Sequence, residues 1–154
     1  MNYSKVSAGI SLGICILSSA MLIILAFIFP EFFKTMYMTY NEFGSPEVLS
    51  KLMTWVVPAF YCCVPFAAAA LYMLIRLLLN IIKDKVFIVR NVRLLRFISW
   101  CCYAVMLITF ISSCGFPVLI IIAFAMAVVG TLLRVVKNVM DSAVKIREEN
   151  DLTI

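Results

Sequence analysis

Three long stretches of this sequence, residues 6–30, 52–75 and 97–133, contain no acidic or basic side chain. A helix needs roughly 20 apolar residues to cross the hydrocarbon core of a bilayer, so each stretch is long enough to span a membrane. The composition agrees, because 65% of the 154 residues are hydrophobic and only 14% are charged. A soluble domain of this size has too little polar surface to cover so much apolar material. The chain is therefore predicted to be an integral membrane protein.

The third stretch is about twice as long as one span needs, and Gly115 and Pro117 lie near its middle. These residue types break helices most strongly, so the stretch is predicted to form a tight hairpin of two helices. Each helix would be about 27 Å long at 1.5 Å per residue. The four predicted spans are about 6–30, 55–79, 97–114 and 117–134.

The first span has an alternative interpretation as a cleaved signal peptide, because Ser18 and Ala20 form a small-x-small pattern after an apolar stretch. The positive region before it is limited to Lys5, and the apolar run continues well past Ala20 to Phe29. A retained membrane anchor is therefore favoured.

Basic residues predict the orientation, since cytoplasmic loops accumulate Lys and Arg. They gather between spans two and three and after span four: Lys83, Lys85, Arg90, Arg93, Arg96, Arg134, Lys137, Lys145 and Arg147. The segment after span one is nearly balanced in charge, and the turn of the last hairpin is uncharged. The prediction is one all-α, polytopic membrane domain over 1–154, with four transmembrane helices and both termini in the cytoplasm. The net charge of +5 then reflects topology and anionic lipid headgroups, and a nucleic-acid partner is not expected.

Arg90, Arg93 and Arg96 recur every three residues and so spread over about 120° of one helical face. This pattern indicates an interfacial helix leading into span three, with its guanidinium groups among anionic lipid headgroups. A binding site for a cytosolic partner is the alternative.

Helix four is predicted to extend into the cytoplasm as an amphipathic helix over about 135–149. Its acidic and basic residues alternate at helical spacing: Lys137, Asp141, Lys145 and Glu149. Its apolar residues form a second stripe: Leu132, Val136, Val139, Met140, Ala143 and Ile146. That stripe would rest on the membrane surface, the inner loop or a second protein chain.

No constellation of residues indicates catalysis, a cofactor or a metal. The chain has no histidine, and its six cysteines include no C-x-x-C spacing. The predicted spans contain no ionisable residue at membrane depth, where transporters and pumps usually place them. Their polar residues, among them Tyr61, Tyr72, Ser99, Thr109 and Thr131, favour hydrogen bonds between helices over a polar pathway. We therefore expect neither an enzyme nor a cofactor.

Parts of the inner loop and the C-terminus resemble a family of small bacterial four-helix membrane proteins that is catalogued as a domain of unknown function. The resembling segments are 86–87, 91–92, 95–98 and 149–154. Val86 stands where a proline is frequent in that family, which is a mild departure. The resemblance implies a bacterial cytoplasmic membrane but no activity. Its members are often encoded beside a small helix-turn-helix regulator, which implies a role in signalling or stress response.

The candidate interaction residues are Arg90, Asn91, Arg93, Arg96, Asp151, Leu152 and Thr153. One hypothesis has the last four residues docking as an extended segment, with acidic side chains meeting the arginines; a frayed terminus is the alternative. The predicted function is a non-enzymatic accessory, regulatory or immunity-like role on the cytoplasmic face, with a membrane or cytosolic protein partner or a homo-oligomer. A small transporter or channel subunit is the second hypothesis, and an enzyme acting on lipid is the third.

Overall fold

A computed structural model describes residues 2–43, 46–83, 86 and 88–152, without the side chains of 2–6, 33–34, 36–37, 40–43, 46–49, 52 and 150–152. Within these ranges the chain is all-helical. Its four helices are α1 (Asn2–Phe43), α2 (Pro46–Ile82), α3 (Val89–Ser112) and α4 (Leu119–Leu152). Each contains a segment long and apolar enough to cross a membrane. The predicted fold class, an all-α chain with four membrane-spanning helices, is confirmed.

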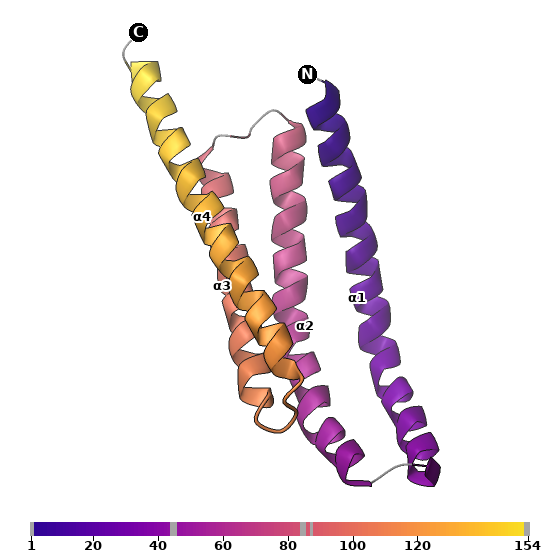
Figure 1. Cartoon of the computed structure of the whole chain (residues 1–154). Helices are drawn as coiled ribbons and strands as arrows, with labels where there is room; N and C mark the ends of the chain where they lie inside the picture. Colours follow the sequence, from indigo (N-terminus) through magenta and orange to yellow (C-terminus); the bar gives the residue numbers. More distant parts are fainter. Residues whose placement is uncertain (1, 44–45, 84–85, 87, 153–154) are drawn as a thin grey trace.

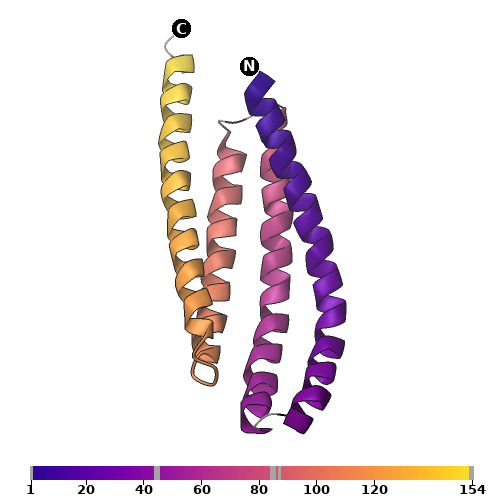
Figure 2. The same ribbon diagram turned by 45° about the vertical axis from the view of Figure 1, so that its right-hand side comes forward.

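The helices run alternately up and down, and each packs against its neighbour in the sequence (Figures 1 and 2). In the described residues no backbone contact joins helices that are not consecutive, so they form an open row rather than a closed ring. The beginning of α1, the end of α2, the beginning of α3 and the end of α4 all lie at one end of the molecule (Figure 1). We call this end the basic end, because it carries Lys83, Arg90, Arg93, Lys145 and Arg147.

Helix α1 continues well beyond the predicted span of about 6–30, although Pro30 lies within it. A proline has no amide hydrogen, so the carbonyl oxygen of Ala26 loses its usual donor within the helix. The hydroxyl of Tyr61 in α2 donates a hydrogen bond to that oxygen at 3.1 Å. Nearby, the rings of Phe29 and Phe60 stack with their centroids 3.9 Å apart. Helix α2 thus supplies the hydrogen bond that Pro30 removes, and α1 does not end there.

Helix α2 begins at Pro46, well before the predicted span of about 55–79, and it runs unbroken through Pro58 and Pro65. The turn between α3 and α4 packs against it. A Cβ atom on Gly115 would overlap the indole ring of Trp55, so only glycine fits this approach. The predicted hairpin is present, with its turn between Ser112 and Leu119 rather than between 114 and 117.

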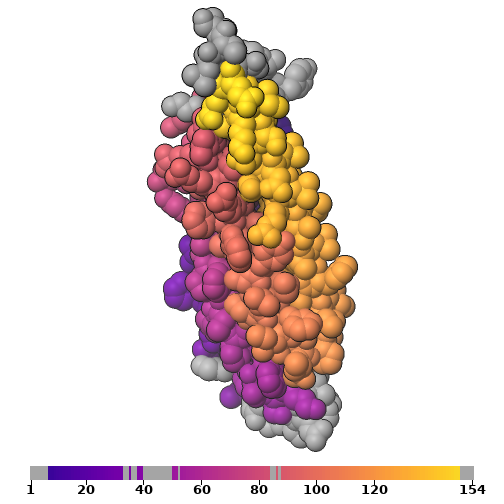
Figure 3. Space-filling model, turned by 90° about the vertical axis from the view of Figure 1, so that its left-hand side faces the viewer, coloured from indigo at the N-terminus to yellow at the C-terminus, as the bar shows by residue number. Residues whose placement is uncertain are grey.

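Among the described residues, α3 and α4 share the most extensive interface, and their surfaces lie side by side in Figure 3. The buried Ser99 hydroxyl donates to the carbonyl oxygen of Gly130 at 3.0 Å. A Cβ atom on Gly130 would lie only 3.2 Å from the ring of Tyr103 and 3.3 Å from Cys102. Small residues permit such close packing in a membrane, where helices gain little from hydrophobic association.

The segment expected to form an interfacial helix before a span at 97 is continuous with that span, because Val89–Ser112 forms one helix. Its placement among lipid headgroups remains a prediction. The predicted apolar stripe on the last helix is largely exposed in the described chain, with Val139 at 64% and Ile146 at 60% exposed, so its contact with the membrane surface or a second chain also remains a prediction. The buried residue there is Val144, at 4% exposed. Helix α4 nevertheless runs on past the beginning of α3, as Figure 1 shows.

Candidate functional site

Asn91 anchors the connection between α2 and α3 at the basic end. Its side chain is 0% exposed. The Asn91 carboxamide oxygen accepts a hydrogen bond from Asn80 Nδ2 at 2.8 Å, and its nitrogen donates to the carbonyl oxygen of Val86 at 2.8 Å. Its backbone amide donates to Ile88, closing the first turn of α3. One buried amide therefore ties the end of α2, the loop and the start of α3 together.

Arg90, Arg93 and Arg96 lie on the first two turns of α3 and are all exposed. Within the part of the chain that the structure describes, their guanidinium groups have no hydrogen bond or ion pair. The buried residues of the same turns are Asn91, Val92 and Leu95, so packing fixes the backbone beneath the arginines. Positive charges are unfavourable at a helix N-terminus, and helix stability therefore does not explain this cluster.

The structure places the remaining candidate residues near the end of α4 but does not pair them with the arginines. Asp151 and Leu152 continue the helix, so the extended conformation predicted for them is wrong. Their side chains, and all of Thr153, lie outside the described residues. The nearest described ion pair on α4 joins Lys145 and Asp141 at 3.8 Å, one turn apart along the same helix. Docking of the tail onto the arginines remains a prediction.

A second basic feature, which sequence reasoning missed, lies where α3 and α4 face each other just below the basic end. The guanidinium carbon of Arg134 lies 5.6 Å from the ring centroids of both Trp100 and Tyr103. Both distances are typical of cation–π contacts. The Tyr103 hydroxyl also lies 3.2 Å from the hydroxyl of Thr131, one turn before Arg134 on α4. The sequence did contain a signal for this site. Trp100 and Tyr103 are spaced by three residues on the third predicted span, and Arg134 is the last residue of the fourth.

Some polar residues of the spans join helices, as the sequence predicts, and others bond within their own helix. Tyr61 and Ser99 each donate to a backbone carbonyl of a neighbouring helix. Thr109 instead bonds to carbonyl groups of its own helix. Tyr72 accepts hydrogen bonds from Arg76, one turn along α2. These contacts satisfy polar groups at membrane depth, where an unpaired group is costly.

Cysteine and acidic side chains form no cluster of three or more in the described part of the chain. The cysteines in it are free, and no group of three or more His, Cys, Asp or Glu side chains among the described residues is placed to hold a metal ion. The features that stand out are therefore the basic end, with its anchored arginines, and the aromatic site of Arg134.

Four long apolar helices, with polar side chains paired between them, define a multi-pass membrane protein. The chain belongs to the family described as protein of unknown function (DUF2975), whose model matches residues 31–154. This agrees with the resemblance noted in the sequence. Comparison with curated proteins and with solved structures found no match.

Proposed function

We propose that this protein is a non-enzymatic accessory or regulatory protein of a bacterial cytoplasmic membrane, acting through its basic end. The observation that carries the proposal is the set of three exposed arginines, Arg90, Arg93 and Arg96, held on a fixed backbone without partners among the described residues. Exposed guanidinium groups bind carboxylates and phosphates through charge-assisted, often bidentate hydrogen bonds. The occupant of this face is therefore an acidic surface.

The basic end is proposed to face the cytoplasm, because cytoplasmic segments of membrane proteins are enriched in Lys and Arg. Arg90 and Arg93 point away from the buried face of α3 that contains Asn91 and Val92. The end of α4 continues past the beginning of α3 (Figure 1) and adds a second, mixed-charge surface. An acidic membrane or cytosolic protein could contact both elements at once. An immunity-like or regulatory role requires such a stoichiometric contact and no chemistry.

Affinity purification from native membranes after mild crosslinking tests this proposal. The wild-type chain should retain a partner protein in stoichiometric amount, and the double variant Arg90→Gln, Arg93→Gln should lose it. Lys51→Gln is the matched control, because Lys51 is an exposed cation near the start of α2, away from the basic end. Binding should also weaken as salt rises, since exposed charges are screened beyond about 8 Å at physiological ionic strength. Equal retention by the wild type and the double variant would contradict the proposal.

A further inference from the structure

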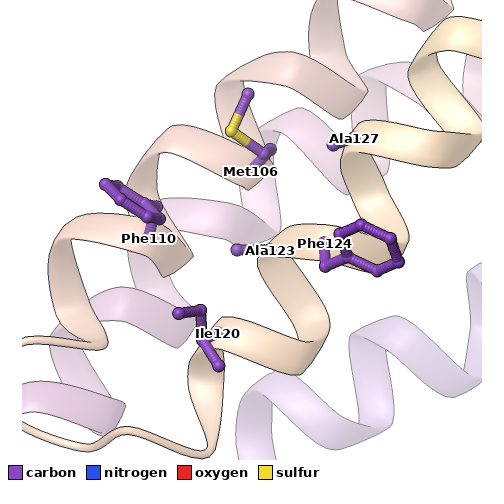
Figure 4. Close-up of a pocket in the computed structure, with 6 residues that line it drawn as sticks. All are labelled: Met106, Phe110, Ile120, Ala123, Phe124 and Ala127. Atoms are coloured by element: carbon purple, nitrogen blue, oxygen red, sulfur yellow. The ribbon is translucent and has the colours of Figure 1, made fainter.

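The groove between α3 and α4 is polar and cationic at one end and apolar along the rest of its length. Arg134, Thr131, Ala127, Ala123 and Ile120 follow one another on a single face of α4 at intervals of three or four residues. At the apolar end, side chains from both helices line an open hollow of about 330 Å³ (Figure 4). Its lining residues are Met106, Phe110, Ile120, Ala123, Phe124 and Ala127.

Small side chains form the floor of this hollow, and aromatic side chains form its walls. In Figure 4, Ala123 lies on α4 between Phe110 of α3 and Phe124 of α4, and Ala127 lies one turn further along α4, at the height of Met106. A second, open hollow of about 260 Å³ is lined by α4 alone and also includes Ala127, together with Thr131. Ala127 thus lines both hollows, and Thr131 lies one turn before Arg134 on the same face of α4.

The cationic end is preorganised. The rings of Trp100 and Tyr103 hold the guanidinium group of Arg134 by cation–π contacts. Within the described chain, this group makes no hydrogen bond or ion pair, so its N–H donors are available. Arg96 lies on α3 one turn before Trp100, on the flank that also carries Tyr103, and is exposed. Arg134, held on the aromatic pair, and Arg96, one helical turn before Trp100 on the same face, supply two guanidinium groups, a chemistry that matches a phosphate group.

The length of the groove fits one leaflet of a bilayer. Along α4, the distance from Arg134 to Ala123 is about 16 Å at 1.5 Å per residue. Half of the hydrocarbon core is about 15 Å thick. A lipid with its headgroup at Arg134 would thus place an acyl chain along Ala127 and into the hollow at Ala123.

We propose that one anionic phospholipid binds in the groove between α3 and α4, its phosphate at Arg134 and Arg96 and an acyl chain against Ala127 and Ala123. A second copy of this chain is the competing occupant, but it would bring two sets of these arginines together without an acidic residue on the groove's lining. Charge complementarity therefore favours the lipid. This site goes beyond the proposed function and shares only Arg96 with it.

Native mass spectrometry of the full-length protein, purified in mild detergent with added phosphatidylglycerol or phosphatidylcholine, tests the site. One phosphatidylglycerol should be retained about tenfold more strongly than phosphatidylcholine, as expected for charge-assisted hydrogen bonds. Arg134→Ala should reduce that retention about tenfold. Arg147→Ala is the control, because Arg147 is an exposed cation of the same helix away from the groove. Equal losses in the two variants would indicate diffuse charge attraction and overturn the proposal.

The variant Ala127→Leu tests the apolar half separately, because it fills the groove and leaves Arg134 in place. It should lower phosphatidylglycerol retention several-fold, with a melting temperature within a few degrees of the wild type. Unchanged retention would overturn the acyl-chain site.

Two competing occupants are tested in the same spectra. Millimolar inorganic phosphate should not displace the lipid; displacement would indicate a site for a free anion. A lipid-free dimer of the wild type in the same spectra would assign the groove to a second copy. The Arg134→Ala variant should still retain the partner protein of the basic end. Loss of the lipid and loss of the partner protein are therefore separate outcomes, and one proposal can fail without the other.

Discussion

Replacing Asn91 by alanine tests whether the basic end is a fixed platform. Asn91 is completely buried, and its side chain bonds to Asn80 and to the carbonyl oxygen of Val86. The variant leaves both groups without these partners, and each such loss costs about 1–3 kcal/mol when the group is buried. Since Asn80 and Val86 are only half-buried, we expect a combined loss of roughly 2–4 kcal/mol. At about 2–4 °C per kcal/mol, the melting temperature should fall by roughly 5–15 °C.

Thermal unfolding of the purified protein in detergent, followed by circular dichroism or by loss of the monodisperse peak, measures this effect. Asn80→Ala should lose less stability than Asn91→Ala, and the double variant should lose less than the sum, because the two residues share a hydrogen bond. Asn138→Ala is the control at an exposed position of α4 and should change stability by no more than about 0.5 kcal/mol. If Asn91→Ala melts at the same temperature as Asn138→Ala, the hydrogen bonds of Asn91 do not stabilise the basic end.

Two further predictions concern helix packing and are checked by the same melting assay. Gly115→Ala should cost about 1–3 kcal/mol, because its Cβ overlaps the ring of Trp55. That cost should disappear in a Trp55→Ala background, and Gly9→Ala, which meets open space, should cost nothing; equal effects at both glycines would contradict the packing. Tyr61→Phe should cost about 0.5–1.5 kcal/mol by removing the donor to the carbonyl that Pro30 leaves free. In a Pro30→Ala background this cost should shrink, and an undiminished cost would disprove the link between Tyr61 and Pro30.

The sequence predicts the number of helices and their approximate spans because each span needs a long uncharged run, and such runs are visible without any tertiary information. It also predicts the final hairpin, from Gly115 and Pro117. It does not predict that α1 continues through Pro30. That outcome depends on a hydroxyl from Tyr61, and no local pattern in α1 reveals a donor on another helix.

The candidate site was predicted in part. The spacing of Arg90, Arg93 and Arg96 identifies an exposed basic face, and all three are exposed in the structure. Asn91 was a candidate for contact with a partner, but its side chain is buried and donates a hydrogen bond to the chain's own loop. The site around Arg134 could not be derived from one helix alone. It needs the register between α3 and α4, which the contact between Ser99 and Gly130 fixes.

We propose that the four helices cross the membrane and that the basic end faces the cytoplasm. Thiol labelling in intact spheroplasts tests this topology. Cys114 is exposed at the turn between α3 and α4, and the other five cysteines can be replaced by alanine. A second protein, with all six replaced and Arg90→Cys introduced, reports on the basic end.

A membrane-impermeant maleimide should label Cys114 in intact spheroplasts and should label the Arg90→Cys protein only after the membrane is opened. The melting temperature of each labelled protein confirms that it remains folded. Labelling of both proteins in intact spheroplasts would contradict the crossing of α3, whose two ends carry the two positions. Labelling of the Arg90→Cys protein alone would overturn the orientation and, with it, the proposed cytoplasmic role of the basic end.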